Sequence, residues 1–373
     1  MKRIATVTFH RAHNFGSVLQ TYALQEYIIN LCHENGEKVE YKVVDLFTEN
    51  QEQLYSVYKK NNSLKNIFKN LIAFPFSRDL KLKHKKFELF LNEYIYLTER
   101  YKTSNELKKN PPEADFFISG SDQIWNVRAK DFSSSYYLDF VKSGKKISYA
   151  ASFGPLNIKW EKYDYADIQN LLKEYKYISV RENGSAENVE KLTGSSCPVN
   201  IDPTLLLDKE EWRKIQSSTN YRNGKYILLY CLEPTKEQLK IANMISSKLK
   251  LPILVLRYNN KNDMFNRYVK RYNSGPKDFL SYIDHAELVL TSSFHGTVFS
   301  LIYNKPFYVF NGMGDNRIST ILTKTDMCLR ALNCMDDIEK VNLQIPDEKK
   351  IKRFLENERI KSEIYLRESL ELA

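Results

Sequence analysis

Short apolar runs that end in small, polar loops and alternate with stretches of helical periodicity restrict the fold of this chain more than any other feature. A β-rich run at residues 4–9 is followed by a polar loop, a helical stretch at about residues 17–31 and a second β run at residues 38–46. This order is that of a β-α-β unit. The sequence therefore predicts an α/β fold with open parallel sheets, in which ligands gather at the carboxyl ends of the strands.

The alternation occurs in two halves. With 373 residues, the chain is long enough for about two domains. A polar, charged stretch at residues 208–225 separates the halves. The first half has further β runs at residues 116–119, 147–151 and 178–180, and the second half has them at residues 226–231, 253–256, 288–291 and 307–310. We predict two doubly wound, Rossmann-like domains that face a cleft, at residues 1–215 and 216–345, with a closing helix at residues 346–373.

The charge of the chain suggests anionic partners. Lys and Arg number 56 and Asp and Glu 46, which gives a net charge of +10. Nucleic acid, an anionic membrane and phosphorylated metabolites are all compatible with this charge. Residues 48–110 are rich in lysine and asparagine, and they read either as helices with solvated polar faces or as a dock for an anionic membrane that bears a lipid-linked glycan.

The sequence also indicates a cellular location. The five cysteines are scattered without a C-x-x-C pair, and the start of the chain lacks the apolar core of a secretory signal. No apolar run approaches the roughly 20 residues needed to span a bilayer. We expect a cytoplasmic protein that can associate peripherally with the inner membrane face.

The first candidate binding segment is the loop at residues 10–16, between a strand and a helix. A helix N-terminus favours an anion because its backbone N–H groups are unpaired. The loop lacks the glycine patterns of dinucleotide and nucleoside triphosphate sites. The alternative is a helix start capped by Asn14 or Ser17. The candidate binding residues in this loop are His10, Arg11, His13, Asn14 and Gly16.

The second candidate segment, ISGSDQIWN at residues 118–126, also follows a strand. Asp122 is a candidate base for a sugar hydroxyl, and Trp125 a candidate platform for a sugar ring, with Ser121 and Gln123 as neighbouring binding residues. The alternatives are a helix cap for Asp122 and a core position for Trp125.

Arg181 follows the apolar run at residues 178–180, so we expect it at the edge of the sheet, where its guanidinium suits a carboxylate or phosphate. The alternative is a structural ion pair with Glu182 or Glu187. Asp202 precedes a proline, and a turn is the stronger interpretation of that pair.

The most specific local pattern is LTSSFHGT at residues 290–297, in which a β run leads through hydroxyl residues to His-Gly and a helical stretch. A phosphate could lie on the helix N-terminus, where His295 supplies a proton or a positive charge. A lone histidine is otherwise more often structural. The candidate binding residues are Ser292, Ser293, Phe294, Gly296 and Thr297.

Six segments in order resemble the polysaccharide pyruvyl transferase family: TFHRAHNFGSVLQTYALQ, ISGSDQIWN, YAASFG, ISVREN, IDPTLLL and LTSSFHGTVFSLIYNKPF. The resemblance implies a paired Rossmann-like (GT-B-like) fold. It also implies transfer of a pyruvyl unit from phosphoenolpyruvate to two hydroxyls of a sugar or lipid-linked oligosaccharide, which forms a cyclic ketal in bacterial exopolysaccharide or capsule biosynthesis.

The resemblance implies roles for three residues and shows one departure. His295 is the expected acid or phosphate stabiliser, Asp122 the expected base and Arg181 a donor-site cation. The first domain is expected to hold the acceptor and part of the donor site. Many family members have Arg-x-His-Gly where this chain has Ser293 at the first position, so Arg181, Arg11, His10 or His13 would have to supply the missing charge. No cofactor and no metal are expected, and phosphoenolpyruvate is the donor substrate.

Two other functions fit the sequence less well. A GT-B glycosyltransferase with a nucleotide sugar commonly has an acidic residue for the ribose hydroxyls, and none stands out in the His-Gly helix. A nucleic-acid binder is suggested by the net charge of +10. However, the chain has no recognised nucleic-acid motif, and its basic residues are interspersed with acids, so no nucleic-acid partner is expected.

Overall fold

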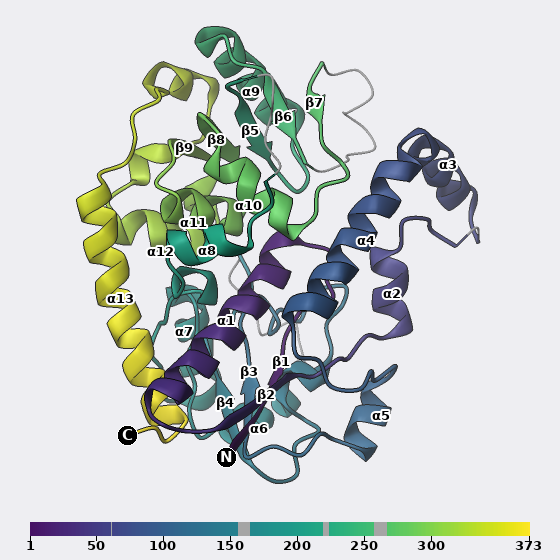
Figure 1. Cartoon of the computed structure of the whole chain (residues 1–373), viewed down its shortest axis with the longest axis vertical. Coiled ribbons are helices and arrows are strands. Elements are labelled where there is room, and N and C mark those ends of the chain that lie inside the picture. Colours follow the sequence, from purple (N-terminus) through teal and green to yellow (C-terminus); the bar gives the residue numbers. More distant parts are fainter. Residues whose placement is uncertain (61, 156–164, 219–223, 257–266) are drawn as a thin grey trace. The chain divides into compact units, whose positions relative to one another are not determined.

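The first sheet begins with β1 (Lys2–Val7), which lies at its centre. β2 (Val39–Val43) pairs with one side of β1, and β3 (Phe116–Ser119) with the other. β4 (Lys145–Ser148) pairs with β3, which gives the order β2-β1-β3-β4 with all strands parallel. The computed structural model describes residues 1–60, 62–155, 165–218, 224–256 and 267–373 (Figure 1).

A second parallel sheet has the order β10-β9-β8-β5-β6-β7. If its strands are numbered along the chain from one to six, this is the 3-2-1-4-5-6 order of Rossmann sheets, which reverses between β5 and β8. In register, Tyr230 at the end of β5 is paired with Thr291 at the end of β8. The strands are β5 (Ile227–Tyr230), β6 (Ile253–Val255), β7 (Val269–Lys270), β8 (Leu288–Thr291), β9 (Phe307–Phe310) and β10 (Ala331–Leu332).

Helices connect the strands, as parallel pairing requires. The described α-helices are α1 (Phe15–Glu34), α2 (Glu49–Tyr55), α3 (Leu64–Ala73), α4 (Ser77–Tyr94), α5 (Ser104–Lys109), α6 (Ala166–Lys173), α7 (Asn183–Thr193), α8 (Lys209–Ile215), α9 (Lys236–Leu249), α10 (Pro276–Asp284), α11 (Phe294–Ile302), α12 (Asn316–Lys324) and α13 (Glu348–Ser369). The described 3₁₀ turns are η1 (Phe74–Phe76), η2 (Ser134–Tyr137), η4 (Pro203–Leu205), η5 (Gly312–Gly314), η6 (Cys328–Arg330) and η7 (Met335–Lys340).

The chain divides into two compact units, each with its own sheet. The first unit consists of Met1–Tyr55, Leu91–Leu207 and Leu355–Ala373, and the second of Ser56–Phe90 and Asp208–Phe354. Each sheet has a separate apolar core, with Val7, Phe117 and Trp125 in the first and Leu229, Ile245 and Leu290 in the second. The α/β class with parallel sheets is therefore as the sequence predicts.

This division differs from the boundaries expected at residues 215/216 and 345/346. Residues 208–215 belong to the second unit because Trp212 in α8 packs its ring edge-on against Phe299, with ring centroids 5.0 Å apart. Residues 56–90 also join that unit, since Lys86 forms an ion pair with Asp278 (2.6 Å). The final helix contributes to both units. Part of the polar stretch expected to separate the halves, residues 219–223, lies outside the described residues.

The run at residues 178–180 does not form the expected strand. Val180 makes only isolated bridges, with Ala151 and with Val199. The hydroxyl of Ser179 donates to the carbonyl of Ser148 (3.1 Å), and the Ser148 hydroxyl donates to the carbonyl of Ser179 (3.0 Å), so side chains share the pairing with β4. The segment still runs along the sheet and brings Arg181 to its carboxyl edge.

Candidate functional site

In the first unit, the candidate site lies where the strand order reverses, between β1 and β3. Thr8, after β1, donates its hydroxyl to the carbonyl of Ser121, after β3 (3.0 Å). Gln20 in α1 joins both loops, because its amide nitrogen donates to Thr8 Oγ1 (2.9 Å) and its amide oxygen accepts from the Ser121 N–H (3.2 Å). The loop at the end of β3 is thus fixed by side chains from the first β-α-β unit.

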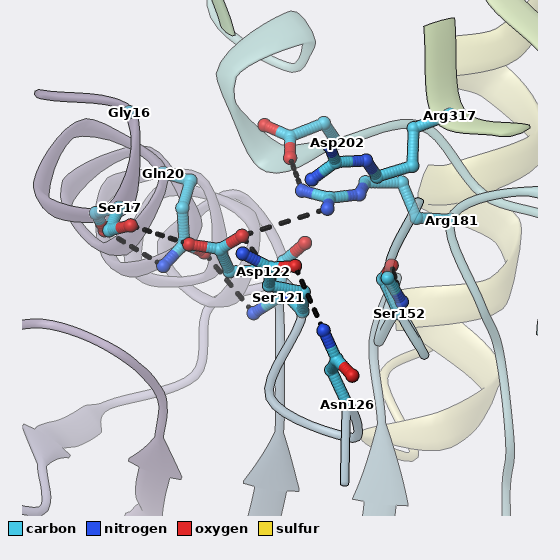
Figure 2. A network of polar contacts seen from close by, with 12 residues as sticks. Gly16, Ser17, Gln20, Ser121, Asp122, Asn126, Ser152, Arg181, Asp202 and Arg317 are labelled. Carbon is cyan, nitrogen blue, oxygen red and sulfur yellow. Dashed lines mark hydrogen bonds and ion pairs between the residues drawn. The ribbon is translucent and has the colours of Figure 1, made fainter. Parts of the chain in front are cut away.

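Asp122 is held in place by this loop. Its Oδ2 accepts a hydrogen bond from Ser17 Oγ (2.6 Å), and its Oδ1 accepts one from the Gln123 N–H (2.8 Å). The backbone of Asp122 is left-handed, with φ 73°, a conformation that Asp tolerates better than most residues. The alternative of a helix cap does not apply, since the described residues 121–127 contain no helix. Figure 2 shows Ser17, Gln20 and Asp122 side by side.

Arg181 lies among three carboxylates, and Figure 2 shows two of them, Asp122 and Asp202. Its Nη1 is 2.7 Å from Asp202 Oδ2, its Nη2 3.6 Å from Asp122 Oδ1 and its Nε 3.6 Å from Glu182 Oε2. Burial would lower the pKa of Arg181, but Asp202, Asp122 and Glu182 outweigh burial and raise it. The buried Arg181 side chain is therefore always charged.

This geometry matches the alternative of a structural ion pair with Glu182 and adds Asp202 and Asp122 to it. The role of Arg181 as a donor-site cation stays a prediction. Asp202, which accepts hydrogen bonds from the backbone N–H (3.0 Å) and hydroxyl (2.6 Å) of Thr204, both caps a turn and orients Arg181.

His10 and Arg11 form a second buried group, centred on Asp45 after β2. The Nε2 of His10 lies 3.0 Å from Asp45 Oδ1, and the Nη2 of Arg11 lies 2.7 Å from Asp45 Oδ2. Burial would raise the pKa of Asp45, but the hydrogen bonds from Arg11 and His10 hold it well below its usual range. Both basic side chains are engaged with this carboxylate, and their expected role in place of the missing family arginine stays a prediction.

The other first-unit candidates have mainly structural positions. Asn14 caps α1 by accepting from the N–H of Gly16 (3.0 Å), as the alternative interpretation of this loop predicts. His13 and Gln123 are half-buried. Ser121 is fully buried and donates its hydroxyl to the Ala150 carbonyl (2.8 Å).

Trp125 is a core residue. Its side chain is 0% exposed and stacks on Tyr137 with an interplanar angle of 8°, and its Nε1–H donates to Ser119 Oγ (3.0 Å). The expectation that its ring binds a sugar is wrong, because both the ring and its polar N–H are already occupied inside the core.

In the second unit, the His-Gly helix begins beside the reversal point between β5 and β8. Ser293 is the N-cap of α11, and its hydroxyl accepts from the N–H of Gly296 (3.4 Å). A Cβ on Gly296 would lie 2.3 Å from Thr291 Oγ1, so the glycine lets α11 approach the end of β8. The helix start is thus set at the carboxyl edge of the sheet, where Rossmann sheets bind ligands.

His295 lies in the first turn of α11. Its ring is edge-on to Phe294, with centroids 5.1 Å apart, and its residue is 6% exposed. Ser292 is half-buried. Phe294 is 3% exposed and packs rather than presenting a binding face. The Thr297 hydroxyl donates to the Ser293 carbonyl (3.1 Å), and its expected contact with a phosphate stays a prediction.

A residue that the sequence did not single out supplies a cation near this helix. Arg317 in α12 lies with its guanidinium carbon 5.8 Å from the centre of the Phe294 ring. Arg317 donates two hydrogen bonds to Asp315, from Nη2 to Oδ2 (2.6 Å) and from Nε to Oδ1 (3.0 Å). No sequence signal links Arg317 to Phe294, because the two residues meet through the packing of α12 beside α11.

Comparison with solved structures identifies the class of fold. A putative UDP-N-acetylglucosamine 2-epimerase from Listeria monocytogenes has 10% sequence identity and a TM-score of 0.51, over 98% of this chain and 90% of that chain. A UDP-N-acetylglucosamine 2-epimerase from Rickettsia bellii has 11% identity and a TM-score of 0.51, over 100% and 96%. These likenesses and the two parallel sheets place the chain in the GT-B class of α/β folds.

The sequence then identifies the family. Residues 14–312 match the family described as Polysaccharide pyruvyl transferase, and the chain belongs to it. No curated protein matches the sequence. The family confirms the resemblance drawn from six short segments and makes the chain a transferase of polysaccharide biosynthesis.

Proposed function

We propose that the protein transfers a pyruvyl group from phosphoenolpyruvate to two hydroxyls of a sugar and forms a cyclic ketal in bacterial exopolysaccharide or capsule biosynthesis. The observation that carries the proposal is the capped start of α11, with Ser293, His295 and Gly296 at the reversal point of the second sheet. Family membership supplies the reaction class.

The donor is assigned to the second unit. Phosphoenolpyruvate carries a phosphate and a carboxylate, and the start of α11 offers backbone N–H groups, the positive end of a helix dipole and the hydroxyl of Ser293. His295 would donate a proton or a hydrogen bond to the donor. Arg317 would supply the positive charge that the family arginine provides elsewhere, since it is the guanidinium that lies over Phe294.

The sugar hydroxyl is assigned to Asp122. A carboxylate that accepts from Ser17 and lies against Arg181 is fixed in orientation, as a positioned general base requires. Arg181 and Ser17 would then act through Asp122 and not on the substrate.

The proposed reaction balances without a cofactor. One sugar hydroxyl adds to C2 of phosphoenolpyruvate while C3 takes up a proton, which converts the methylene into a methyl group. The second hydroxyl attacks C2 as the C2–O bond to phosphate breaks. The protons lost by the two hydroxyls balance the one taken up by C3 and the one carried away by hydrogen phosphate.

The experiment is to incubate the protein with phosphoenolpyruvate and a panel of free and lipid-linked oligosaccharides. We expect release of phosphate and a mass gain equal to one pyruvyl ketal in a single member of the panel. Turnover of a nucleotide sugar, with no reaction of phosphoenolpyruvate, would replace this proposal by the alternative of a GT-B glycosyltransferase.

Variants test the assigned residues. His295→Ala and Asp122→Asn should each lower kcat by about 10²- to 10⁴-fold, the usual contribution of a positioned acid or base. His33→Ala changes an exposed histidine at the end of α1 and should leave kcat unchanged. Near-normal rates in both site variants would show that the donor and acceptor groups lie elsewhere.

A further inference from the structure

The helix α3 carries its apolar face outward. Ile67 and Phe68 lie three and four residues after Leu64, and Leu71 lies three residues after Phe68, so the four residues share one face of the helix. These four side chains are 85%, 40%, 64% and 66% exposed, and Phe74, in the following turn, is 69% exposed. Such a stripe normally packs against a core, and here it forms a continuous exposed surface, which we call the α3 face.

Hydrogen bonds, a helix cap and a ring contact fix the segment that carries the α3 face. Asn70 holds the preceding loop, because its Oδ1 accepts from the Lys59 N–H (2.9 Å) and its Nδ2 donates to the Lys59 carbonyl (2.8 Å). The helix is capped by Ser63. Phe76 anchors its end by packing edge-on against Tyr272, with ring centroids 5.4 Å apart. The apolar side chains are thus presented by fixed structure, and Figure 1 shows α3 at the N-terminal end of α4.

The same segment concentrates the positive charge of the protein. Residues 56–90 contain nine lysines and arginines against two acids, Asp79 and Glu88, which is a net charge of +7 out of +10 for the whole chain. Lys60 and Lys69 are exposed. Lys59 and Lys60 line a hollow of about 470 Å³, together with apolar side chains of the α3 face: Ile67, Leu71 and Phe74.

We propose that the α3 face docks the protein on an anionic membrane surface. A short amphipathic helix with aromatic and aliphatic residues on one face, and lysines beside them, lies in the plane of the membrane with its apolar side in the acyl boundary. The lysines pair with anionic headgroups. The hollow has both apolar and basic lining residues. Its apolar walls would contact an acyl chain, and its lysines would contact a lipid phosphate.

The charge favours a membrane over a second copy of the chain. A symmetric dimer through the α3 face would bring together two segments that each have a net charge of +7, and their electrostatic repulsion would oppose association. Among the helices that the structure describes, none is long and apolar enough to cross a membrane. A helix of 10 residues is about 15 Å long, so α3 can lie on a bilayer but cannot span it.

The experiment is flotation of the full-length protein with vesicles and no substrate. We expect binding to vesicles of phosphatidylglycerol and phosphatidylcholine, weaker binding in high salt, and little binding to phosphatidylcholine alone. The double variant Phe68→Glu/Leu71→Glu should bind at least tenfold more weakly, and Lys60→Glu/Lys69→Glu should lose binding to the anionic vesicles. Leu329→Glu, at a residue that is 81% exposed elsewhere in the same unit, should bind like the wild type.

Three outcomes would overturn the inference: no binding of the wild type to anionic vesicles, unchanged binding of the Phe68→Glu/Leu71→Glu variant, or a wild-type dimer that this variant dissociates in solution. Circular dichroism of each variant checks the fold, which substitutions at exposed positions should preserve. Because vesicle binding is measured without substrate, its failure is distinct from failure of the proposed pyruvyl transfer.

Discussion

At the scale of single residues, buried ion pairs decide what the polar side chains can do. Arg181 and Arg11 both look like anion-binding residues in the sequence, and both lie against buried carboxylates in the structure. An arginine in such a pair orients its acidic partner, and removal of either partner leaves an uncompensated buried charge. The acidic partners Asp122 and Asp45 are therefore the residues whose substitution is most informative.

Asp45→Asn should destabilise the protein in a pH-dependent way. Its folded-state pKa lies below the ordinary value of 3.8, so the ionised form contributes stability that is complete at neutral pH and is lost as the pH falls below about 4. The variant leaves Arg11 buried without its carboxylate, which costs about 3–5 kcal/mol at pH 7. Urea unfolding at pH 7, 5 and 3 should show the difference from wild type shrinking on acidification.

Asp115→Asn is the matched control, because Asp115 is half-exposed and pairs with the half-exposed Arg3 (3.1 Å). The Asp115→Asn variant should lose less than about 1 kcal/mol of unfolding free energy. If Asp45→Asn and Asp115→Asn lost equal amounts of unfolding free energy, burial of the Asp45 group would contribute nothing to stability.

At the scale of elements, the two sheets place their functional loops by the same rule. In each sheet the strand order reverses at one point, and the candidate loops follow the strands that flank it: β3 in the first unit and β8 in the second. Small residues are needed at these points because a helix or loop passes close to neighbouring atoms. Gly120 shows this in the first unit, where a Cβ would lie 2.1 Å from the carbonyl oxygen of Tyr149.

Gly296→Ala should therefore destabilise the second unit and shift α11. Alanine is better than glycine in a helix by about 1 kcal/mol, but the added Cβ would meet Thr291 Oγ1 at 2.3 Å and Tyr230 Cδ1 at 3.1 Å. We expect the cost of overpacking to exceed the gain in helix propensity. Denaturant unfolding should then show a net loss of about 1–2 kcal/mol in the free energy of unfolding.

Ser300→Ala is the control within α11. It removes a hydroxyl that donates to the Gly296 carbonyl (2.7 Å) and adds no atom, so we expect a change below about 1 kcal/mol. A Gly296→Ala variant as stable as wild type would show that α11 can move away from β8 without cost.

At the scale of the whole molecule, the end of the chain completes the first unit. Arg359 in α13 donates to the carbonyls of Leu205 (2.7 Å) and Leu207 (2.8 Å), and the hydroxyl of Tyr365 donates to the carbonyl of Ser148 (2.7 Å). The first unit is thus assembled from three segments of sequence, the last of them only 19 residues long. Its stability should depend on this final segment.

Leu366→Ala should weaken the first unit selectively. Leu366 is 0% exposed, and loss of its side chain should cost about 2–5 kcal/mol through lost burial and a cavity. Hydrogen exchange followed by mass spectrometry should show faster exchange in residues 91–207, while residues 208–354 keep their protection. Ile364 is in the same helix but is 59% exposed, so Ile364→Ala should leave hydrogen exchange unchanged in both ranges of residues. Equal loss of protection in both units would show that they unfold as one.

The sequence determined the elements and their order, because the signals for strands, helices and turns are local. Residues 116–119, 288–291 and 307–310 form strands with the predicted bounds. The loops with Asp122 and His295 are predictable for the same reason, since polar residues that directly follow a buried strand lie at the carboxyl edge of a parallel sheet.

Tertiary structure decided which side chains meet. Arg181 and Asp202 are 21 residues apart, and Arg11 and Asp45 are 34 apart, so only the strand order brings each pair together. Tertiary structure also decided which apolar stripe is covered: α3 has the pattern of a packed helix, yet no neighbour covers its face among the described residues. A helical pattern specifies that one face is apolar, and only the packing of the chain specifies what that face contacts.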